Sequence, residues 1–224
     1  MKDILLLLHD DDSTTGTTQS WCESRKLTYD IKNAERFGRH APTPGEYRGV
    51  IVFGGNMEAW EEEKHPWLKA EKRMLQEFSG AGRGIFGICL GVQLMADAFG
   101  GRAFPMEEWE IGWRPTSLLE GAATIMPLYW HSSSFTLPPK SSVIAKGSSG
   151  LNLGFRRGAK EVGYQFHTEI DEIRLSAVLS TLKPGMKGSI PSEQKMRADA
   201  IKFMEPLRNW YYQALDRWLN SLSA

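Results

Sequence analysis

The sequence has few cysteines, no net charge and no long apolar run near its start, and each shortage excludes a class of protein. Its two cysteines, Cys22 and Cys89, are too few for a disulfide framework and favour a reducing, cytoplasmic compartment. Lysine plus arginine and aspartate plus glutamate number 27 each, so no basic field attracts nucleic acid. The apolar run at residues 4–8 is too short for a signal peptide or a membrane span. We therefore expect neither nucleic acid nor a membrane as a partner.

What remains has the composition and length of an α/β domain. The 224 residues are 41% hydrophobic and 24% charged, which is ordinary for a globular protein with a real core. Residues 67–78 have helical spacing, and the breaker residues 79–82 follow them. The short apolar runs that predict strands lie at residues 4–8, 50–53, 85–88 and 162–166. We expect a three-layer α/β fold, with a mostly parallel central sheet and helices on both of its faces.

The second half of the sequence has a different texture. Residues 110–142 carry four prolines between short apolar pieces, which predicts a small added antiparallel sheet. Residues 183–191 predict an exposed loop, and C-terminal helices are expected over about 192–221. Ser192 suits the cap of the first of these helices, and Pro206 suits the end of the first and the start of a second. We take residues 1–224 as a single domain.

The second C-terminal helix carries one broad apolar face that water would disfavour. The face consists of Leu207, Trp210, Tyr211, Ala214, Trp218 and Leu219. A surface helix of an α/β protein normally packs on its own sheet, and this is the interpretation we prefer. A homodimer or partner contact is the alternative, because aromatic side chains are enriched in interface cores.

A candidate nucleophile lies in residues 84–91, Gly-Ile-Phe-Gly-Ile-Cys-Leu-Gly, which read as a strand entering a tight turn at Cys89. Glycines two positions either side of a reactive residue relieve crowding when a strained turn lifts that residue above a sheet. The spacing of residues 92–99 predicts a helix after the turn, and free amides at a helix start favour a thiolate. The alternative is that Cys89 is a small buried hydrophobe.

A candidate base lies in residues 163–169, Gly-Tyr-Gln-Phe-His-Thr-Glu, which have strand character. Side chains two apart on a strand point to the same face, so we expect His167 and Glu169 to be neighbours. A carboxylate beside an imidazole fixes its tautomer and raises its basicity. Taken singly, such a pair more often marks a solvated strand face. Together with the turn at Cys89 it predicts a Cys-His-Glu triad.

Four segments follow one another in an order that points to a known family. They are FGGNM at residues 53–57, GICLGVQL at 87–94, WHSSSFTLP at 130–138 and YQFHTE at 164–169. These segments resemble the glycine pair, the nucleophile motif, the WHGDTFxLP segment and the QFHPE motif of class I glutamine amidotransferases. The similarity is greatest to the stand-alone branch that resembles the amidotransferase domain of GMP synthase.

The resemblance implies a catalytic role for five residues. Cys89 would be the nucleophile, His167 the general base and acid, and Glu169 its orienter. The backbone amides of Gly55 and Leu90 would form the oxyanion hole. Physical chemistry agrees, because an oxyanion needs preorganised N–H donors and glycine lets the backbone come close.

The substrate-binding candidates are Gln93, His131 and Ser132. By the resemblance, Gln93 would help to hold the α-substituents of a bound glutamine, whereas His131 would have a structural or substrate-lining role, since one dyad already supplies the base. Three departures from the family pattern stand out: Asn56 where proline is common, Ser-Ser at 132–133 in place of Gly-Asp, and Thr168 in place of proline. Thr168 leaves the spacing of the dyad intact, but Ser132 alters a backbone approach that the family makes with glycine.

The run Asp10-Asp11-Asp12 raises the question of a metal site. An acidic run after a first strand is more typical of a solvated loop or a helix cap, so we expect no metal and no cofactor.

The expected activity is hydrolysis of the glutamine side-chain amide through a cysteine thioester, with release of ammonia. A γ-glutamyl peptidase, a plain glutaminase and a non-catalytic ligand-binding or regulatory module remain as alternatives. The sequence contains neither a Walker-type segment nor a pyrophosphatase-type SGGxDS loop. Any ammonia acceptor is therefore expected to be a separate enzyme, and the substrate a small molecule.

Overall fold

The chain alternates strands and helices in its first half and continues with antiparallel strands before two C-terminal helices. The computed structural model describes residues 1–10, 14–37 and 40–223. The helices are α1 (Thr18–Ser24), the 3₁₀ turn η1 (Ala34–Arg36), α2 (Trp67–Gly80), α3 (Leu90–Ala98), α4 (Glu172–Leu179) and α5 (Glu193–Ser221). The strands are β1 (Lys2–Leu8), β2 (Tyr29–Asn33), β3 (Tyr47–Val52), β4 (Gly84–Ile88), β5 (Arg102–Trp113), β6 (Thr116–Leu118), β7 (Thr124–Ile125), β8 (Leu128–Thr136), β9 (Ser141–Lys146), β10 (Asn152–Arg157) and β11 (Glu161–Tyr164).

A large sheet runs through the molecule. Within the described residues it has nine strands, in the order β2-β1-β3-β4-β11-β10-β9-β6-β7. Neighbours from β2 to β11 are parallel, because helices or long loops connect them, and neighbours from β11 to β7 are antiparallel. The predicted mostly parallel central sheet is therefore confirmed.

Strands β5 and β8 pair with each other in a separate antiparallel sheet, which confirms the predicted addition. Its extent differs from the prediction, because β5 begins at Arg102, and β6 and β7 join the large sheet instead. A proline at position 105 obscured the first part of β5. It is tolerated there because β5 pairs with β8 on one side only, so a missing N–H can face away from the ladder.

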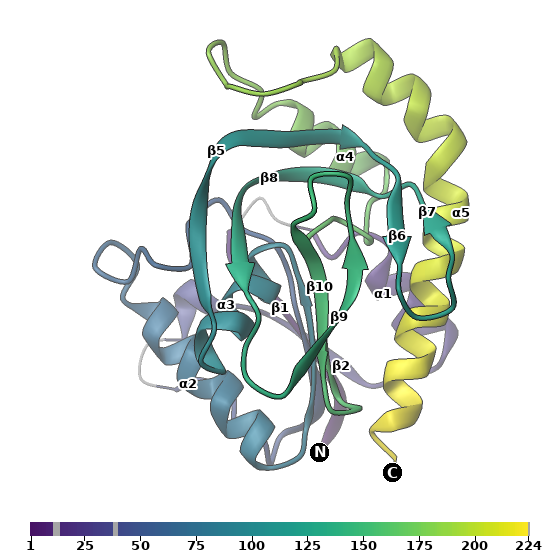
Figure 1. Cartoon of the computed structure of the whole chain (residues 1–224). Coiled ribbons are helices and arrows are strands. Elements are labelled where there is room, and N and C mark those ends of the chain that lie inside the picture. Colours follow the sequence, from purple (N-terminus) through teal and green to yellow (C-terminus); the bar gives the residue numbers. More distant parts are fainter. Residues whose placement is uncertain (11–13, 38–39, 224) are drawn as a thin grey trace.

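Alternating side chains place two parts of the core on opposite faces of the sheet, and a third part joins residues of β5, β8, α4 and α5. On β1, Leu5 and Leu7 pack with apolar residues of α2 and α3, whereas Ile4 and Leu6 pack with residues of α1 and α5. Figure 1 shows the two pairs of helices on either side of the sheet. Because both faces are covered, β1 reads as a continuous apolar run, and the predicted three layers are confirmed.

The C-terminal residues form one helix rather than the two predicted. Helix α5 continues through Pro206, although proline cannot donate the bond to the carbonyl of Lys202. Both residues are exposed, so water can hydrogen-bond that carbonyl. Buried side chains on either side of the proline, such as Ala200 and Leu207, hold the helix on the core. Ser192 caps the helix as predicted, accepting the N–H of Lys195 at 3.2 Å.

The aromatic face of α5 packs on the chain's own sheet, as we preferred. The indole of Trp218 lies where side chains on Gly49 of β3 and Gly84 of β4 would otherwise stand. Its Nε1–H donates to the Lys160 carbonyl at 2.9 Å. Tyr211 is fully buried and its hydroxyl bonds that of Thr18 on α1 at 2.9 Å. Most of the face therefore packs in the same part of the core as Ile4 and Leu6, whereas Leu207 packs with residues of β5 and α4.

Truncation after Glu205 is expected to unfold the protein. It removes several buried side chains, each of which contributes about 1.5–3 kcal/mol, from a fold whose total stability is about 5–15 kcal/mol. Circular dichroism melting and gel filtration of the truncated chain provide the measurement. A folded, active monomer obtained from a dimeric full-length protein would instead support an interface role for this face.

The parallel strands deliver the candidate site residues to one edge of the sheet. β3 leads into the Gly54-Gly55 loop and β4 into Cys89, while β11 points toward His167. In open α/β sheets, ligands bind outside the carboxyl ends of the strands, which is where these residues lie. None of the helices in the described part of the chain combines the length and hydropathy that a membrane crossing requires.

Candidate active site

Cys89 sits in a strained turn between β4 and α3. Its φ of 55° and ψ of −111° lie outside the conformations that side chains prefer, and it occupies the N-cap of α3. The flanking glycines are sterically required, since a Cβ on Gly91 would lie 2.2 Å from the Val52 carbonyl oxygen. A Cβ on Gly87 would lie 2.8 Å from the backbone of Gly91. The sequence therefore builds the predicted elbow, with Cys89 8% exposed.

His167 and Glu169 are neighbours, but not for the predicted reason. β11 ends at Tyr164, and His167 makes only an isolated antiparallel bridge, donating its N–H to the Leu128 carbonyl at 2.9 Å. The chain bends after β11, and His167 then pairs with β8 rather than with a strand of the large sheet. The imidazole Nδ1 nevertheless lies 2.7 Å from Glu169 Oε1, and both side chains are buried.

The imidazole of His167 also reaches Cys89. A Cβ built on Gly54 would be 3.0 Å from His167 Cε1 and 3.4 Å from Cys89 Cβ, so both side chains converge on this glycine. Burial lowers the pKa of His167, but the charges of Glu169 and Cys89 and the hydrogen bonds to them outweigh burial and raise the pKa to about 10. At neutral pH the ring is therefore an imidazolium beside the Cys89 sulfur.

Two residues without an assigned role in the sequence interpretation touch the triad. Arg174 of α4 is buried, with its Nε 3.8 Å from Glu169 Oε1. Burial alone would raise the pKa of Glu169. The charges of His167 and Arg174 lower the pKa by more than burial raises it, so the carboxylate stays charged. Gln165 donates from Nε2 to Cys89 Sγ at 3.8 Å. Gln165 is within a recognised motif, whereas nothing in the sequence marks Arg174, because burial of an arginine depends on tertiary packing.

The predicted oxyanion-hole residues line the same pocket as Cys89. The pocket has a volume of about 590 Å³. The lining residues are Gly55, Asn56, Met57, Glu58, Cys89, Leu90, Gln93, Trp109, Trp130, His131, Ser132, Ser133, Ser180, Thr181, Lys183 and Met186. Leu90 is the first residue of α3, so its N–H has no intrahelical acceptor. Within the described residues, the Gly55 N–H meets no protein acceptor either. In the part of the chain that the structure describes, both N–H groups are therefore without a backbone acceptor.

The three substrate-binding candidates also line this pocket, but they differ in what they offer. Gln93 uses its Nε2 for Gln165 Oε1 at 3.1 Å and for the Ser133 carbonyl at 3.4 Å, which orients its amide. His131 Nε2 lies 3.0 Å from Glu110 Oε2 across the β5–β8 ladder. Burial lowers the pKa of His131 more than Glu110 raises it, so the ring is neutral at pH 7. Ser132 is partly exposed.

The remaining departures from the family pattern have identifiable surroundings. The N–H of Asn56 donates to Asp10 Oδ2 at 3.2 Å. Thr168 is buried between the two members of the dyad. Asp11 and Asp12, considered above for a metal, lie outside the described residues. The described residues contain no group of three or more histidine, cysteine or acidic side chains arranged to hold a metal ion.

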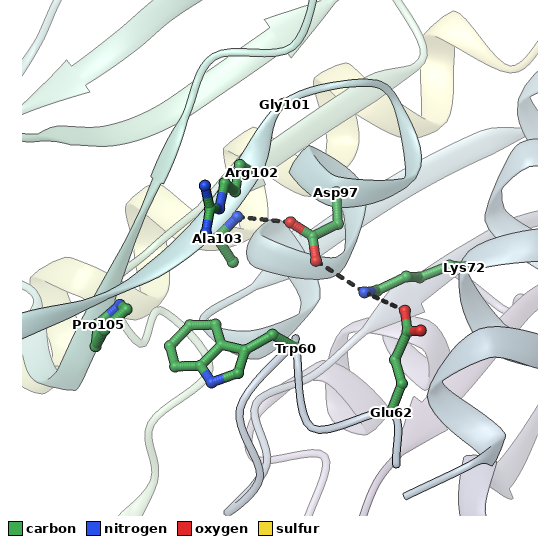
Figure 2. Close-up of a pocket in the computed structure, with 8 residues that line it drawn as sticks. All are labelled: Trp60, Glu62, Lys72, Asp97, Gly101, Arg102, Ala103 and Pro105. Carbon is green, nitrogen blue, oxygen red and sulfur yellow. Dashed lines mark hydrogen bonds and ion pairs between the residues drawn. The ribbon is translucent and has the colours of Figure 1, made fainter.

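A second hollow, of about 630 Å³, lies beside Trp60 and Pro105 and contains no member of the triad. Figure 2 shows that Lys72 of α2 bridges Glu62 and Asp97, with its Nζ 2.8 Å from each carboxylate. Asp97 of α3 also accepts the N–H of Ala103 at 2.6 Å. The charges at the base of this hollow are thus mutually satisfied. These ion pairs connect α2, α3 and the loop that follows Gly55.

The fold and the arrangement of the site agree with a comparison to known families. The model of the glutamine amidotransferase class-I family matches residues 18–174. This chain therefore belongs to the class I glutamine amidotransferases. Membership supports glutamine amide hydrolysis as the general chemistry and a cysteine-dependent amidotransferase as the class of enzyme.

Individual proteins are similar to this chain over much of its length. The chain is 26% identical to the glutamine amidotransferase-like protein YfeJ of Salmonella typhimurium, over 95% of this chain and 92% of that protein. It is 32% identical to the glutamine-hydrolysing GMP synthase of Helicobacter acinonychis, over 62% of this chain but only 27% of the synthase. A crystal structure of a glutamine amidotransferase from Thermotoga maritima superposes with a TM-score of 0.87 at 24% identity, covering 97% of this chain and 98% of that one. This likeness confirms the fold.

Proposed function

We propose that the chain hydrolyses the side-chain amide of glutamine through a γ-glutamyl thioester on Cys89 and releases ammonia. The observation that carries this proposal is the convergence of three groups around Cys89, which lines one pocket together with Gly55 and Leu90. Cys89 stands at the start of α3, His167 is held at Nδ1 by Glu169, and the free amides of Gly55 and Leu90 face no protein acceptor among the described residues.

In the first half-reaction the Cys89 thiolate attacks Cδ of the glutamine amide. The new S–C bond pushes the carbonyl electron pair onto oxygen, and the amides of Gly55 and Leu90 stabilise the resulting oxyanion; each such donor contributes about 3–4 kcal/mol in comparable sites. The His167 imidazolium gives its proton to the amide nitrogen. The C–N bond then breaks, ammonia leaves and the thioester remains.

In the second half-reaction water opens the thioester. His167, now neutral, takes a proton from water, whose oxygen attacks the thioester carbon. The oxyanion forms again at the same two amides. When it collapses, the C–S bond breaks, glutamate leaves, and the thiolate and imidazolium are restored. Glu169 keeps its charge throughout and holds the ring in the tautomer that both steps need.

Gln93, His131 and Ser132 are proposed to position the α-amino and α-carboxyl groups of the substrate. A γ-glutamyl peptidase remains as a second candidate because Lys183 and Met186 line the same pocket. The ammonium group of Lys183 would suit the carboxylate of a residue attached to the γ-glutamyl group. A non-catalytic module is disfavoured, because a pocket that only holds a ligand needs no strained cysteine beside an imidazolium.

The cellular setting is part of the same proposal. The relative in Helicobacter acinonychis is a GMP synthase of which the match covers about a quarter. By analogy, a separate enzyme would accept the ammonia made here.

We propose that residues 1–224 act as one domain, since α5 closes the core of the N-terminal strands. Two free thiols favour a reducing, cytoplasmic setting. A homodimer is a further possibility that gel filtration would test.

The assay that tests the function compares glutamate and ammonia release from glutamine with product release from γ-glutamyl dipeptides. Asparagine, one methylene shorter, serves as the matched control substrate. We expect hydrolysis of glutamine and none of asparagine. A kcat/KM that is higher for the dipeptides would replace the amidotransferase assignment by the peptidase. No turnover of either γ-glutamyl substrate would contradict both and support the non-catalytic module.

A further inference from the structure

A fully buried ion pair lies directly behind the candidate oxyanion hole and takes no part in the triad. His9 follows β1 and Glu71 belongs to α2, and both side chains are 0% exposed. The ring Nε2 lies 3.0 Å from Glu71 Oε1 and 3.2 Å from Oε2. Removing a carboxylate from water costs several kcal/mol unless it is paired and hydrogen-bonded. A buried charge at this place therefore requires a physical reason.

Contacts at both ring nitrogens and at one ring face hold the side chain of His9 in place. Its Nδ1 lies 3.2 Å from the carbonyl oxygen of Gly54, and the ring is stacked on Trp67 with the centroids 5.7 Å apart. A carbonyl can only accept, so Nδ1 carries a proton and donates it to Gly54. Nε2 faces a carboxyl group, so this ring and Glu71 share a second proton. The Glu71 carboxylate thereby selects the ring state that donates to Gly54.

The acceptor of this bond belongs to the same peptide unit as a proposed catalytic donor. The carbonyl of Gly54 and the N–H of Gly55 share one peptide plane, which is trans, as are all peptide bonds that the structure describes. In a trans peptide the C=O and the N–H point in opposite directions. Holding the Gly54 carbonyl toward His9 therefore aims the Gly55 N–H away from His9. Gly55 lines the active-site pocket on that other side.

Steric contacts support the same coupling. A Cβ on Gly55 would lie 2.9 Å from His9 Cβ and 2.9 Å from Leu90 Cδ2. Gly55 therefore packs tightly between His9 and Leu90, whose N–H is the second proposed oxyanion donor. The N–H of Phe53 donates to the Leu7 carbonyl at 3.1 Å, which ties the start of the loop to the end of β1. Two glycines in succession would otherwise leave this peptide free to rotate.

We propose that His9 and Glu71 are positioning residues that orient and polarise the Gly54–Gly55 peptide, so that the Gly55 N–H is preorganised to stabilise the oxyanion. Polarisation follows because a charge-assisted bond to a carbonyl strengthens the hydrogen bond that the N–H of the same peptide donates. This inference rests on the proposed function. Neither residue touches the substrate, and both act through the backbone of the loop.

The test uses two variants of the whole chain in a Cys22→Ala background, so that Cys89 is the only thiol. Glu71→Gln is nearly isosteric and keeps a hydrogen bond to His9 while removing the charge. His9→Leu removes the donor to Gly54. Because loss of an entire oxyanion donor lowers kcat by about 10²–10³-fold, we expect kcat to fall about 10-fold for Glu71→Gln and about 100-fold for His9→Leu. KM should change little, since the donor acts in the transition state.

A second readout separates positioning from general damage. Alkylation of Cys89 by iodoacetamide forms no oxyanion, so its rate should stay within about twofold of that of the parent in both variants. Leu75→Ala is the matched control, because Leu75 is buried one turn further along α2 and belongs to the core. It should lower the melting temperature as much as His9→Leu does, yet leave kcat near that of the parent.

The outcomes are distinct. If the wild type is active and the folded Glu71→Gln variant keeps full kcat, this inference is overturned while the proposed function stands. A parallel loss of alkylation and hydrolysis, or an equal loss of kcat in Leu75→Ala, overturns it as well, because the pair would then be merely structural. A wild type that hydrolyses no γ-glutamyl substrate overturns the proposed function and this inference with it.

Discussion

Replacing Cys89 by alanine is expected to abolish amide hydrolysis while the fold persists. The thiol supplies the covalent step, and loss of the nucleophile in a comparable hydrolase triad lowers kcat by about 10⁶-fold. The backbone strain at Cys89 applies equally to alanine, and loss of one small buried group costs only about 1 kcal/mol. Ammonia release from glutamine and the melting temperature should be measured on the same preparation.

Cys22→Ala provides the matched control. Cys22 is fully buried in α1, and burial together with the nearby Glu23 raises the pKa of its thiol to about 12. It therefore stays protonated at neutral pH. This variant should keep wild-type turnover. A Cys89→Ala protein that retained a tenth of wild-type turnover would remove Cys89 from the role of nucleophile.

The second large effect is a difference between two members of the proposed triad. His167→Ala removes the group that moves the proton, whereas Glu169→Gln removes only the charge that orients it. By comparison with other triads, kcat at saturating glutamine should fall by about 10⁶-fold for the first and about 10⁴-fold for the second. Because Glu169→Gln leaves the buried Arg174 unpaired, its folding must be checked by circular dichroism. Equal losses in folded proteins would mean that the two roles are assigned wrongly.

The pH profile gives an independent check on the same pair. In the wild type the imidazolium persists until the pH approaches the His167 pKa of about 10, so the alkaline limb of kcat/KM should lie near that pH. The charge of Glu169 is the strongest of the effects that raise this pKa. Glu169→Gln should therefore lower the pKa and move the alkaline limb to lower pH. An unchanged limb would mean that another group titrates.

Much of the fold follows from local patterns in the sequence. The apolar runs at β1, β3 and β4 predict buried parallel strands, because helices cover both faces of the sheet and leave no polar side. Two boundaries could not be predicted. Pro105 lies inside β5 and Pro206 inside α5, where an unpaired strand edge and solvent exposure respectively tolerate a missing N–H.

The candidate site could be predicted only as far as its motifs reach. The elbow around Cys89 follows from steric requirements on its glycines, and these requirements are visible in the sequence. The contact between His167 and Glu169 was predicted on the assumption that both lie on one strand. The two side chains are in contact, but β11 ends at Tyr164, before either residue. Arg174 and the His9–Glu71 pair were missed, because contacts between residues far apart in sequence depend on how α2, α4 and β1 pack.

The most direct test of the central claim is to trap the acyl-enzyme. Glutamine is mixed with the enzyme, the reaction is stopped with acid within the first turnovers, and the intact protein and its peptides are weighed by mass spectrometry. The Glu169→Gln variant, in which both steps are slowed, is examined in parallel. We predict a mass increase equal to one γ-glutamyl group, located on Cys89 and lost on treatment with hydroxylamine. Hydrolysis that proceeds with no such adduct in either protein, or with the adduct on another residue, would contradict the thioester mechanism.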